Sequence, residues 1–124
     1  MTATENIAEY IAQCNGFDET YKHWLRGVYS SGVKYVADQA GAFWLIDAIM
    51  SHQTAKLIEA CDGFQHWTLT KNKTGSGAKL VCTDGGIDGK PKVVVTQKIP
   101  FTDFPLQSIE FYYEYGVLML KAER

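Results

Sequence analysis

The first half of the chain has apolar residues at the three- and four-residue intervals of a helix face. Thr2 is followed three residues later by Glu5, the pattern of a capping box, which predicts a helix that begins there. Asp18 is a suitable N-cap for a second predicted helix, whose end is weakened by Gly27. Segment 20–25 also fits an extended conformation, so both alternatives stay open for it.

The densest apolar segment of the chain starts at Ser30. Ser30 or Ser31 caps a third predicted helix, and Gly41 separates it by a break or a kink from a long helix over residues 42–60. Asp47 lies in the middle of this long helix, between two apolar neighbours. A carboxylate in such surroundings is expected to be buried, and burial requires either hydrogen-bond partners or a functional role.

The second half of the chain alternates apolar and polar residues, the pattern of strands with one buried face. Strands are predicted over residues 65–69, 78–82 and 93–99, followed by a hairpin that turns at Tyr115 and Gly116. This turn sets apolar residues opposite each other on one face and opposite charges on the other. The predicted pairs are Glu114–Val117, Tyr113–Leu118, Phe111–Leu120 and Glu110–Lys121.

Together these elements predict a single α+β domain over residues 1–124. Three or four N-terminal helices are expected to pack on one face of a C-terminal antiparallel five-strand meander. Pro100 and Pro105 bracket a connection without a strand, because proline cannot donate a hydrogen bond to a neighbouring strand.

The composition is that of an ordinary globular protein, with 46% hydrophobic and 21% charged residues. The three cysteines are an odd number without the spacing of a metal site, which predicts reduced thiols. They are Cys14, Cys61 and Cys82. The N-terminal residues do not follow the pattern of a signal peptide, and no apolar run is long enough to span a membrane. We therefore expect a cytoplasmic location and no membrane partner.

Charge is unevenly distributed, although the whole chain has a formal net charge of only −2. Residues 64–99 contain six lysines and two acidic residues, whereas the segments on either side are acidic. These lysines lie on predicted strands and turns, where they protect strand edges from aggregation. They are accompanied by no arginine and by no interleaved exposed aromatic residues, so nucleic-acid binding is not favoured.

Two glycine-rich segments resemble ligand-binding loops without meeting their requirements. Residues 75–79 lack the spacing of a phosphate-binding loop and join two strands, whereas such a loop must open a helix. Residues 84–89 lack the full set of oxygen ligands and the closing glutamate of a calcium loop. Both segments are therefore predicted to be connections between strands.

A scattered set of polar and aromatic residues forms a candidate ligand pocket between the helices and the sheet. Its members are Tyr21, His23, Trp24, Asp47 and His52. Three alternatives stay open for this set. Asp47 forms a general acid–base pair with His23 or His66; a metal site forms if His23 or His66 joins Asp47 or His52; or Asp47 accepts structural hydrogen bonds. The structural role is favoured, and no catalytic residue, metal or cofactor is assigned.

A second candidate site is an interaction surface on the last hairpin. Tyr112, Tyr115 and Met119 lie off its apolar face, and exposed tyrosine and methionine are typical of protein interfaces. We expect this surface to mediate contact with a partner, with a homodimer through the sheet as the preferred form.

Several segments resemble a small bacterial family of unknown function, whose members come mainly from cyanobacteria and from plasmid- or phage-associated genes. The segments that resemble it are 21–24, 31–35, 41–49, 51–53 and 116–120. The resemblance implies a standalone cytosolic domain with no assigned activity, cofactor or catalytic residue. A mobile-element setting would favour an accessory or host-interaction role.

The interpretation of the sequence is therefore a non-enzymatic accessory or protein-interaction domain. The alternative is a small enzyme or ligand-binding protein whose pocket surrounds Asp47. The two are distinguished by whether the candidate side chains converge on one concave pocket.

Overall fold

The structure is a computed structural model that describes residues 2–86 and 89–124 of the 124-residue chain. Its helices are α1 (Ala3–Gln13), α2 (Ser31–Ala40), α3 (Phe43–Ser51), α4 (Ala55–Ala60) and the short 3-10 helix η1 (Lys121–Glu123). Its strands are β1 (Thr20–Lys22), β2 (Val28–Ser30), β3 (Phe64–Lys71), β4 (Ala78–Thr83), β5 (Val93–Ile99), β6 (Ser108–Glu114) and β7 (Val117–Leu120). Residues 87 and 88, in the predicted connection over 84–89, lie outside the described residues.

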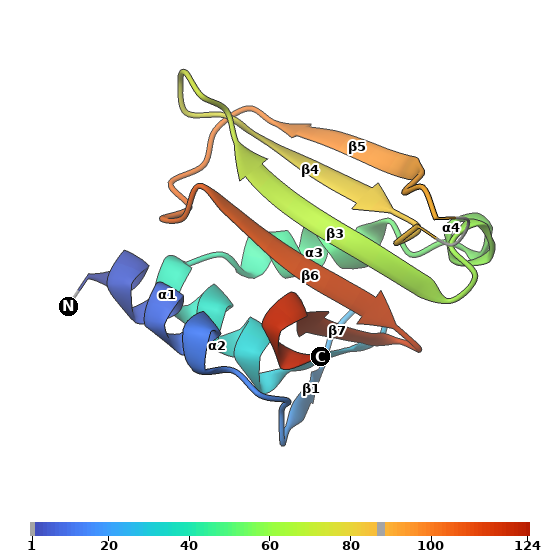
Figure 1. The fold of residues 1–124 in the computed structure, drawn as a ribbon, viewed down its shortest axis with the longest axis horizontal. Helices are drawn as coiled ribbons and strands as arrows, with labels where there is room; N and C mark the ends of the chain where they lie inside the picture. The colour runs from blue at the N-terminus through green and yellow to red at the C-terminus, as the bar shows by residue number, and fades with distance from the viewer. Residues whose placement is uncertain (1, 87–88) are drawn as a thin grey trace.

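The seven strands found in the described residues form one sheet in the order β1-β2-β7-β6-β3-β4-β5. Every neighbouring pair is antiparallel except β2 and β7, which are parallel. In Figure 1, α3 lies behind this sheet, while α1 and α2 lie side by side near its lower edge. The α+β class is confirmed, with four α-helices in the described chain, but the five-strand antiparallel meander is wrong.

The meander is wrong because β6 does not follow β5 in the sheet. The connection over residues 100–107 crosses the end of the β3–β4 hairpin, where the Thr102 N–H donates to the Ser76 carbonyl at 2.7 Å. Phe104 in this connection is 1% exposed and anchors it in the core. β6 therefore pairs with β3 and places Phe111 opposite Trp67 at the centre of the sheet. The crossover buries apolar residues of both strands on the same inner face.

The predicted second helix is also wrong. The alternative prediction, an extended conformation for segment 20–25, is correct for the residues of β1. The chain here forms the β1–β2 hairpin, and β2 pairs with β7. Gly27 has φ +71°, and a Cβ at this position would lie 3.0 Å from the Tyr113 hydroxyl and 3.1 Å from the Gly116 carbonyl oxygen. Helical spacing is outweighed here by pairing with the C-terminal hairpin, which the local sequence does not encode.

The predicted long helix is interrupted between α3 and α4. Thr54 caps α4 by accepting a hydrogen bond from the Leu57 N–H at 3.2 Å. The preceding Gln53 is fully buried, and its side-chain amide forms two reciprocal hydrogen bonds with Gln65 of β3, at 2.8 and 2.7 Å. The Gln65 oxygen also accepts from the Trp67 indole at 2.7 Å. The break is therefore stabilised by a buried polar network, because buried amides require partners.

Other local predictions are confirmed. The side chains of Thr2 and Ser30 cap α1 and α2, and Gly41 ends α2 in the left-handed conformation at φ 62°. The β6–β7 hairpin has the predicted register, with the pairs Glu114–Val117, Tyr113–Leu118 and Phe111–Leu120. Lys121, just beyond β7, lies 3.4 Å from Glu110. The three cysteines are free, two of them buried in the core.

The C-terminal segment closes back onto the start of α2. Glu123 of η1 is 3% exposed, and its carboxylate accepts hydrogen bonds from the Ser30 hydroxyl, the Gly32 N–H at 3.0 Å and the Leu120 N–H at 2.8 Å. Because Gly32 lies in the first turn of α2, the carboxylate sits at the positive end of that helix. A Cβ on Gly32 would lie 2.4 Å from the Glu123 carboxyl carbon, so a side chain at this position would push the carboxylate out of its place.

We expect Gly32→Ala to lower the free energy of unfolding by about 2 kcal/mol, because its methyl group displaces Glu123 and leaves buried N–H groups without an acceptor. In a Glu123→Ala background the same substitution should be neutral or stabilising, since alanine is the better helix former. Chemical denaturation of both single variants and the double variant measures this coupling. Additive effects would contradict the inferred contact.

Candidate functional site

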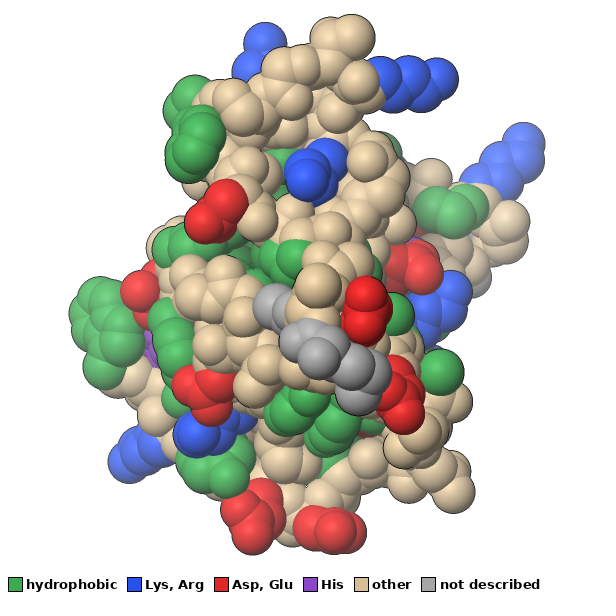
Figure 2. Space-filling view, turned by 90° about the vertical axis from the view of Figure 1, so that its left-hand side faces the viewer, with side chains coloured by type: hydrophobic (Ala, Val, Ile, Leu, Met, Phe, Trp, Pro, Cys, Tyr) green, Lys and Arg blue, Asp and Glu red, His purple; other side chains and the backbone are tan. Residues whose placement is uncertain are grey.

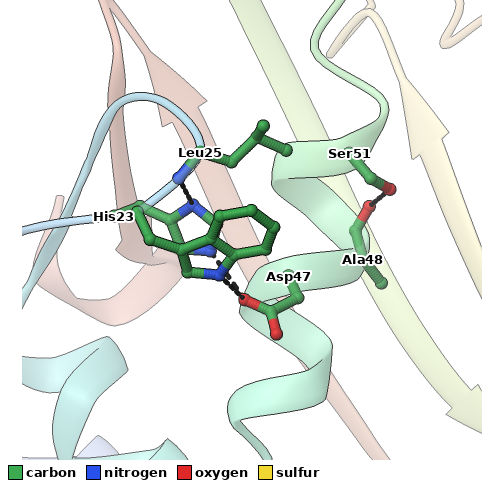
Figure 3. A network of polar contacts seen from close by, with 6 residues as sticks. His23, Leu25, Asp47, Ala48 and Ser51 are labelled. Carbon is green, nitrogen blue, oxygen red and sulfur yellow. Dashed lines mark hydrogen bonds and ion pairs between the residues drawn. The ribbon is translucent and has the colours of Figure 1, made fainter.

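His23, Trp24 and Asp47 are brought together on one side of the sheet. His23 and Trp24 belong to the loop over residues 23–27, which joins β1 to β2 and is closed by a hydrogen bond from the His23 N–H to the Gly27 carbonyl at 3.0 Å. Asp47 projects from α3 toward this loop (Figure 3). The site thus joins a tight turn to the helix that packs behind the sheet.

A single carboxylate oxygen organises the site. Asp47 Oδ1 lies 2.7 Å from His23 Nε2 and accepts from Trp24 Nε1 at 3.0 Å. The other ring nitrogen of His23, Nδ1, accepts from the Leu25 N–H at 3.1 Å (Figure 3). Because Nδ1 is an acceptor, the proton of the ring lies on Nε2 and is donated to Asp47. His23 therefore links the loop to α3 through Nε2, while its Nδ1 accepts a hydrogen bond from within the loop itself.

This arrangement favours the structural interpretation of Asp47 over the acid–base pair. A general base needs a free lone pair, and the lone pair of His23 Nδ1 is occupied by a backbone amide. His23 itself is only 7% exposed. The expectation that Asp47 is buried is wrong, since 49% of its side chain is exposed. The helix turns this face to the surface, where the loop covers only part of it.

The electrostatics of Asp47 follow from these bonds. The hydrogen bond from His23 lowers the pKa of Asp47 below its ordinary value of 3.8, against an opposing effect of desolvation. The hydrogen bond from Trp24 lowers the pKa further. The carboxylate is therefore charged at neutral pH and acts as an acceptor rather than as a proton donor.

A surface hollow of about 270 Å³ lies beside this carboxylate. Its lining residues are Lys22, His23, Trp24, Tyr29, Phe43, Ile46 and Asp47. Tyr29 and Phe43 were not predicted, although Phe43 is one helical turn before Asp47 and therefore shares its face. Tyr21 stacks on Tyr29 with ring centroids 5.8 Å apart, so it supports one wall of the hollow.

His52 is not part of this group. Its Nε2 lies 2.7 Å from the Gln97 side-chain oxygen, and its ring stacks on Trp67 with the centroids 5.6 Å apart. His66 is also elsewhere, with Nε2 2.9 Å from a Glu110 oxygen on the other face of the sheet. Within residues 2–86 and 89–124, no three histidine, cysteine, aspartate or glutamate side chains gather around a possible metal position.

The three residues of the candidate interface differ in exposure. Tyr115 is 89% exposed at the tip of the β6–β7 turn, whereas Met119 is buried. Tyr112 is half-buried and packs against Phe64, and the Arg124 guanidinium lies 5.3 Å from the centre of its ring. Of these three residues, Tyr115 is the one that offers a large accessible aromatic surface.

Sequence reasoning missed one residue that fixes the loop. Arg26 donates a hydrogen bond from its guanidinium to the Gln53 carbonyl, at the break between α3 and α4. A lone arginine before a glycine gives no recognisable signal, because its acceptor is a backbone group 27 residues away. With His23, Arg26 holds the loop at two points, one on α3 and one at the break that follows it.

The buried thiols offer no nucleophile. Burial raises the pKa of Cys61 and of Cys82, and contact between the two thiols is a smaller influence on each. A thiol with a raised pKa stays protonated at neutral pH and reacts poorly. Cys61 and Cys82 are therefore packing residues.

A family model described as Family of unknown function (DUF6876) matches residues 5–124. No curated protein and no solved structure matches the chain significantly. Of the helices in the described part of the chain, none has the length and apolar character needed to cross a membrane.

We expect Asp47→Asn to lower the free energy of unfolding at neutral pH by no more than about 1 kcal/mol, because a half-exposed carboxylate is screened by water. The difference from wild type should shrink as the pH falls below 3.8, since the low pKa of folded Asp47 contributes stability only above the range in which the carboxylate is protonated. Denaturant unfolding between pH 3 and pH 7 measures both effects.

Asp38→Asn is the matched control, because Asp38 is similarly exposed but pairs only with Lys34 on the same helix. It should change stability less than Asp47→Asn does. A pH-independent difference for Asp47→Asn would show that the charge of Asp47 contributes nothing to its contact with His23 and Trp24.

Proposed function

The chain belongs to a family of unknown function, DUF6876, and from its geometry we propose that it is an accessory domain that binds protein. The observation that carries this proposal is Trp24, whose side chain is 78% exposed although its loop is held in place by hydrogen bonds. The free cysteines support a cytoplasmic location as part of the same proposal.

A fixed and exposed tryptophan suits binding. The indole donates to Asp47, so its orientation is set before any partner arrives and little conformational entropy is lost on association. Leu25 and Phe43, both more than 40% exposed, extend the apolar surface around it. Tryptophan is also the residue type most enriched among interface residues that contribute strongly to affinity.

We propose that the partner is a second copy of this chain. A two-fold interface must be self-complementary, and this end of the molecule has both a projecting indole and a hollow beside it that is partly lined by aromatic residues. The neighbouring β6–β7 turn adds Tyr115, since the Val28 N–H donates to the Gly116 carbonyl at 3.0 Å and joins the two loops. Both candidate sites from the sequence therefore contribute to one proposed interface.

We expect Trp24→Ala to weaken dimer formation by about 30-fold or more, the effect of losing a central interface residue worth about 2 kcal/mol. Sedimentation equilibrium over a concentration series measures the dissociation constant. Native mass spectrometry of the freshly purified protein checks the mass of the assembly.

Phe101→Ala is the control, because Phe101 is 70% exposed and lies in the connection after β5 rather than at the proposed interface. It should leave the dissociation constant unchanged. A protein that stays monomeric at high concentration, or a dimer indifferent to Trp24→Ala, would refute the proposed dimer.

A second candidate function is the binding of a small organic cation in the same hollow. The observation that favours it is the charged Asp47 beside the aromatic rings of Trp24, Tyr29 and Phe43. The side-chain hydrogen bonds from His23 and Trp24 both use Oδ1 of this carboxylate, and among the described residues no side chain donates to Oδ2. Aromatic walls and a carboxylate are the groups that bind quaternary ammonium ions.

Choline and its neutral isostere 3,3-dimethylbutanol separate this candidate from simple apolar binding. We expect choline alone to shift the NMR signal of the Trp24 indole N–H, and we expect Asp47→Asn to abolish the shift because the counter-charge is lost. Equal shifts with both compounds would contradict cation recognition. Phe43→Leu, which removes an aromatic wall but keeps the charge, should weaken choline binding to a lesser degree.

A further inference from the structure

The far edge of the sheet is an open strand. β5 pairs with β4 on one side only and is the last strand in the sheet order. Figure 1 shows it along the upper border with no element beyond it. Its seven residues leave alternate N–H and C=O groups without a strand partner. β1, at the opposite edge, has only three residues.

A groove accompanies this edge. It has a volume of about 500 Å³ and lies between β5 and the α3–α4 segment, on the inner side of the sheet. Its lining residues are Ser51, His52, Thr54, Lys56, Leu57, Ala60, Lys92, Val93, Val94 and Val95. Val93, at the start of this edge strand, is 57% exposed and adds an accessible apolar side chain to the groove. An added strand would place alternate side chains into this groove.

The edge and the groove are basic. Lys56 and Lys92 line the groove, and Lys79, Lys90 and Lys98 are exposed on or near the two outer strands. Within residues 2–86 and 89–124, none of these five lysines forms an ion pair. Figure 2 views the molecule from the end opposite α4, where Lys and Arg side chains also project at the upper border and most Asp and Glu side chains of that face lie lower.

We propose that the β5 edge binds an acidic, extended segment of another protein as an additional strand. Main-chain hydrogen bonds to β5 hold the segment, its apolar side chains enter the groove beside Leu57 and Val93, and its carboxylates face Lys56 and Lys92. A second copy of the chain is disfavoured as the occupant, since two basic edges repel each other. This surface lies at the edge opposite the β1–β2 loop, so it is independent of the proposed dimer.

Lysines alone would not support this proposal. Charged side chains on an edge strand also protect a protein from edge-to-edge aggregation, which explains their presence on β5 without any ligand. Protection does not require a groove with an apolar floor next to the strand. The proposal therefore rests on the open edge, the groove and the basic charge together.

The test uses an end-blocked nine-residue peptide whose groove-facing positions alternate valine and glutamate and whose other positions are threonine, titrated into the isotope-labelled full chain and followed by NMR. We expect amide shifts along residues 92–99 and 54–57. A matched peptide with lysine in place of glutamate should cause none. An N-methylated version of the acidic peptide, which lacks alternate N–H donors, should also fail to bind, because strand addition requires them.

Two charge-reversed variants identify the site. Lys56→Glu with Lys92→Glu should weaken the acidic peptide at least tenfold and allow the lysine peptide to bind. Lys71→Glu with Lys73→Glu makes the same charge change away from the groove and should weaken binding less than threefold. Circular dichroism confirms that both remain folded.

Three results would overturn the proposal. They are equal binding of the two peptides, shifts located outside the groove and β5, and self-association of the chain through β5. Trp24→Ala should bind the acidic peptide as wild type does, so failure of the dimer proposal and failure of this one give different results.

Discussion

The parallel pairing of β2 with β7 is the contact on which the rest of the structure depends. It joins residues near positions 28 and 118, so the early β1–β2 hairpin and the last strand of the chain become neighbours in one sheet. From there the β1–β2 loop reaches α3, and Glu123 reaches the first turn of α2. Without this pairing, Asp47 has no histidine partner, and the start of α2 loses a buried acceptor.

The polar groups inside the protein explain why the helical half departs from a simple bundle. Gln53 and Gln65 satisfy each other across the break between α3 and α4, and Arg26 donates to the Gln53 carbonyl. Every buried polar group in such a network needs its partner, because an unpaired one costs about 1–3 kcal/mol. The hydrogen-bond network that stabilises the break therefore also holds the loop that carries Trp24, through Arg26.

The two edges of the sheet present different kinds of binding surface. At the β1 edge, an exposed indole on a fixed loop stands beside a hollow with aromatic and charged lining residues, which suits a compact partner. At the β5 edge, a longer strand with unpaired main-chain groups and a basic groove suits an extended acidic one. The separation of these surfaces by the width of the sheet lets each be altered without disturbing the other.

The sequence by itself determined what depends on near neighbours. Thr2 and Ser30 as caps, Gly41 as the end of α2 and the β6–β7 register follow from residues a few positions apart, and so do the spans of β4 and β5. It also indicated that His23, Trp24 and Asp47 belong together, but it placed His52 with them. Only the tertiary structure decided the β2–β7 pairing, the place of β6 beside β3 and the half-exposed position of Asp47. The reason is physical: these features depend on contacts between segments far apart in the chain, and they override local helical or meander preferences without leaving a local pattern.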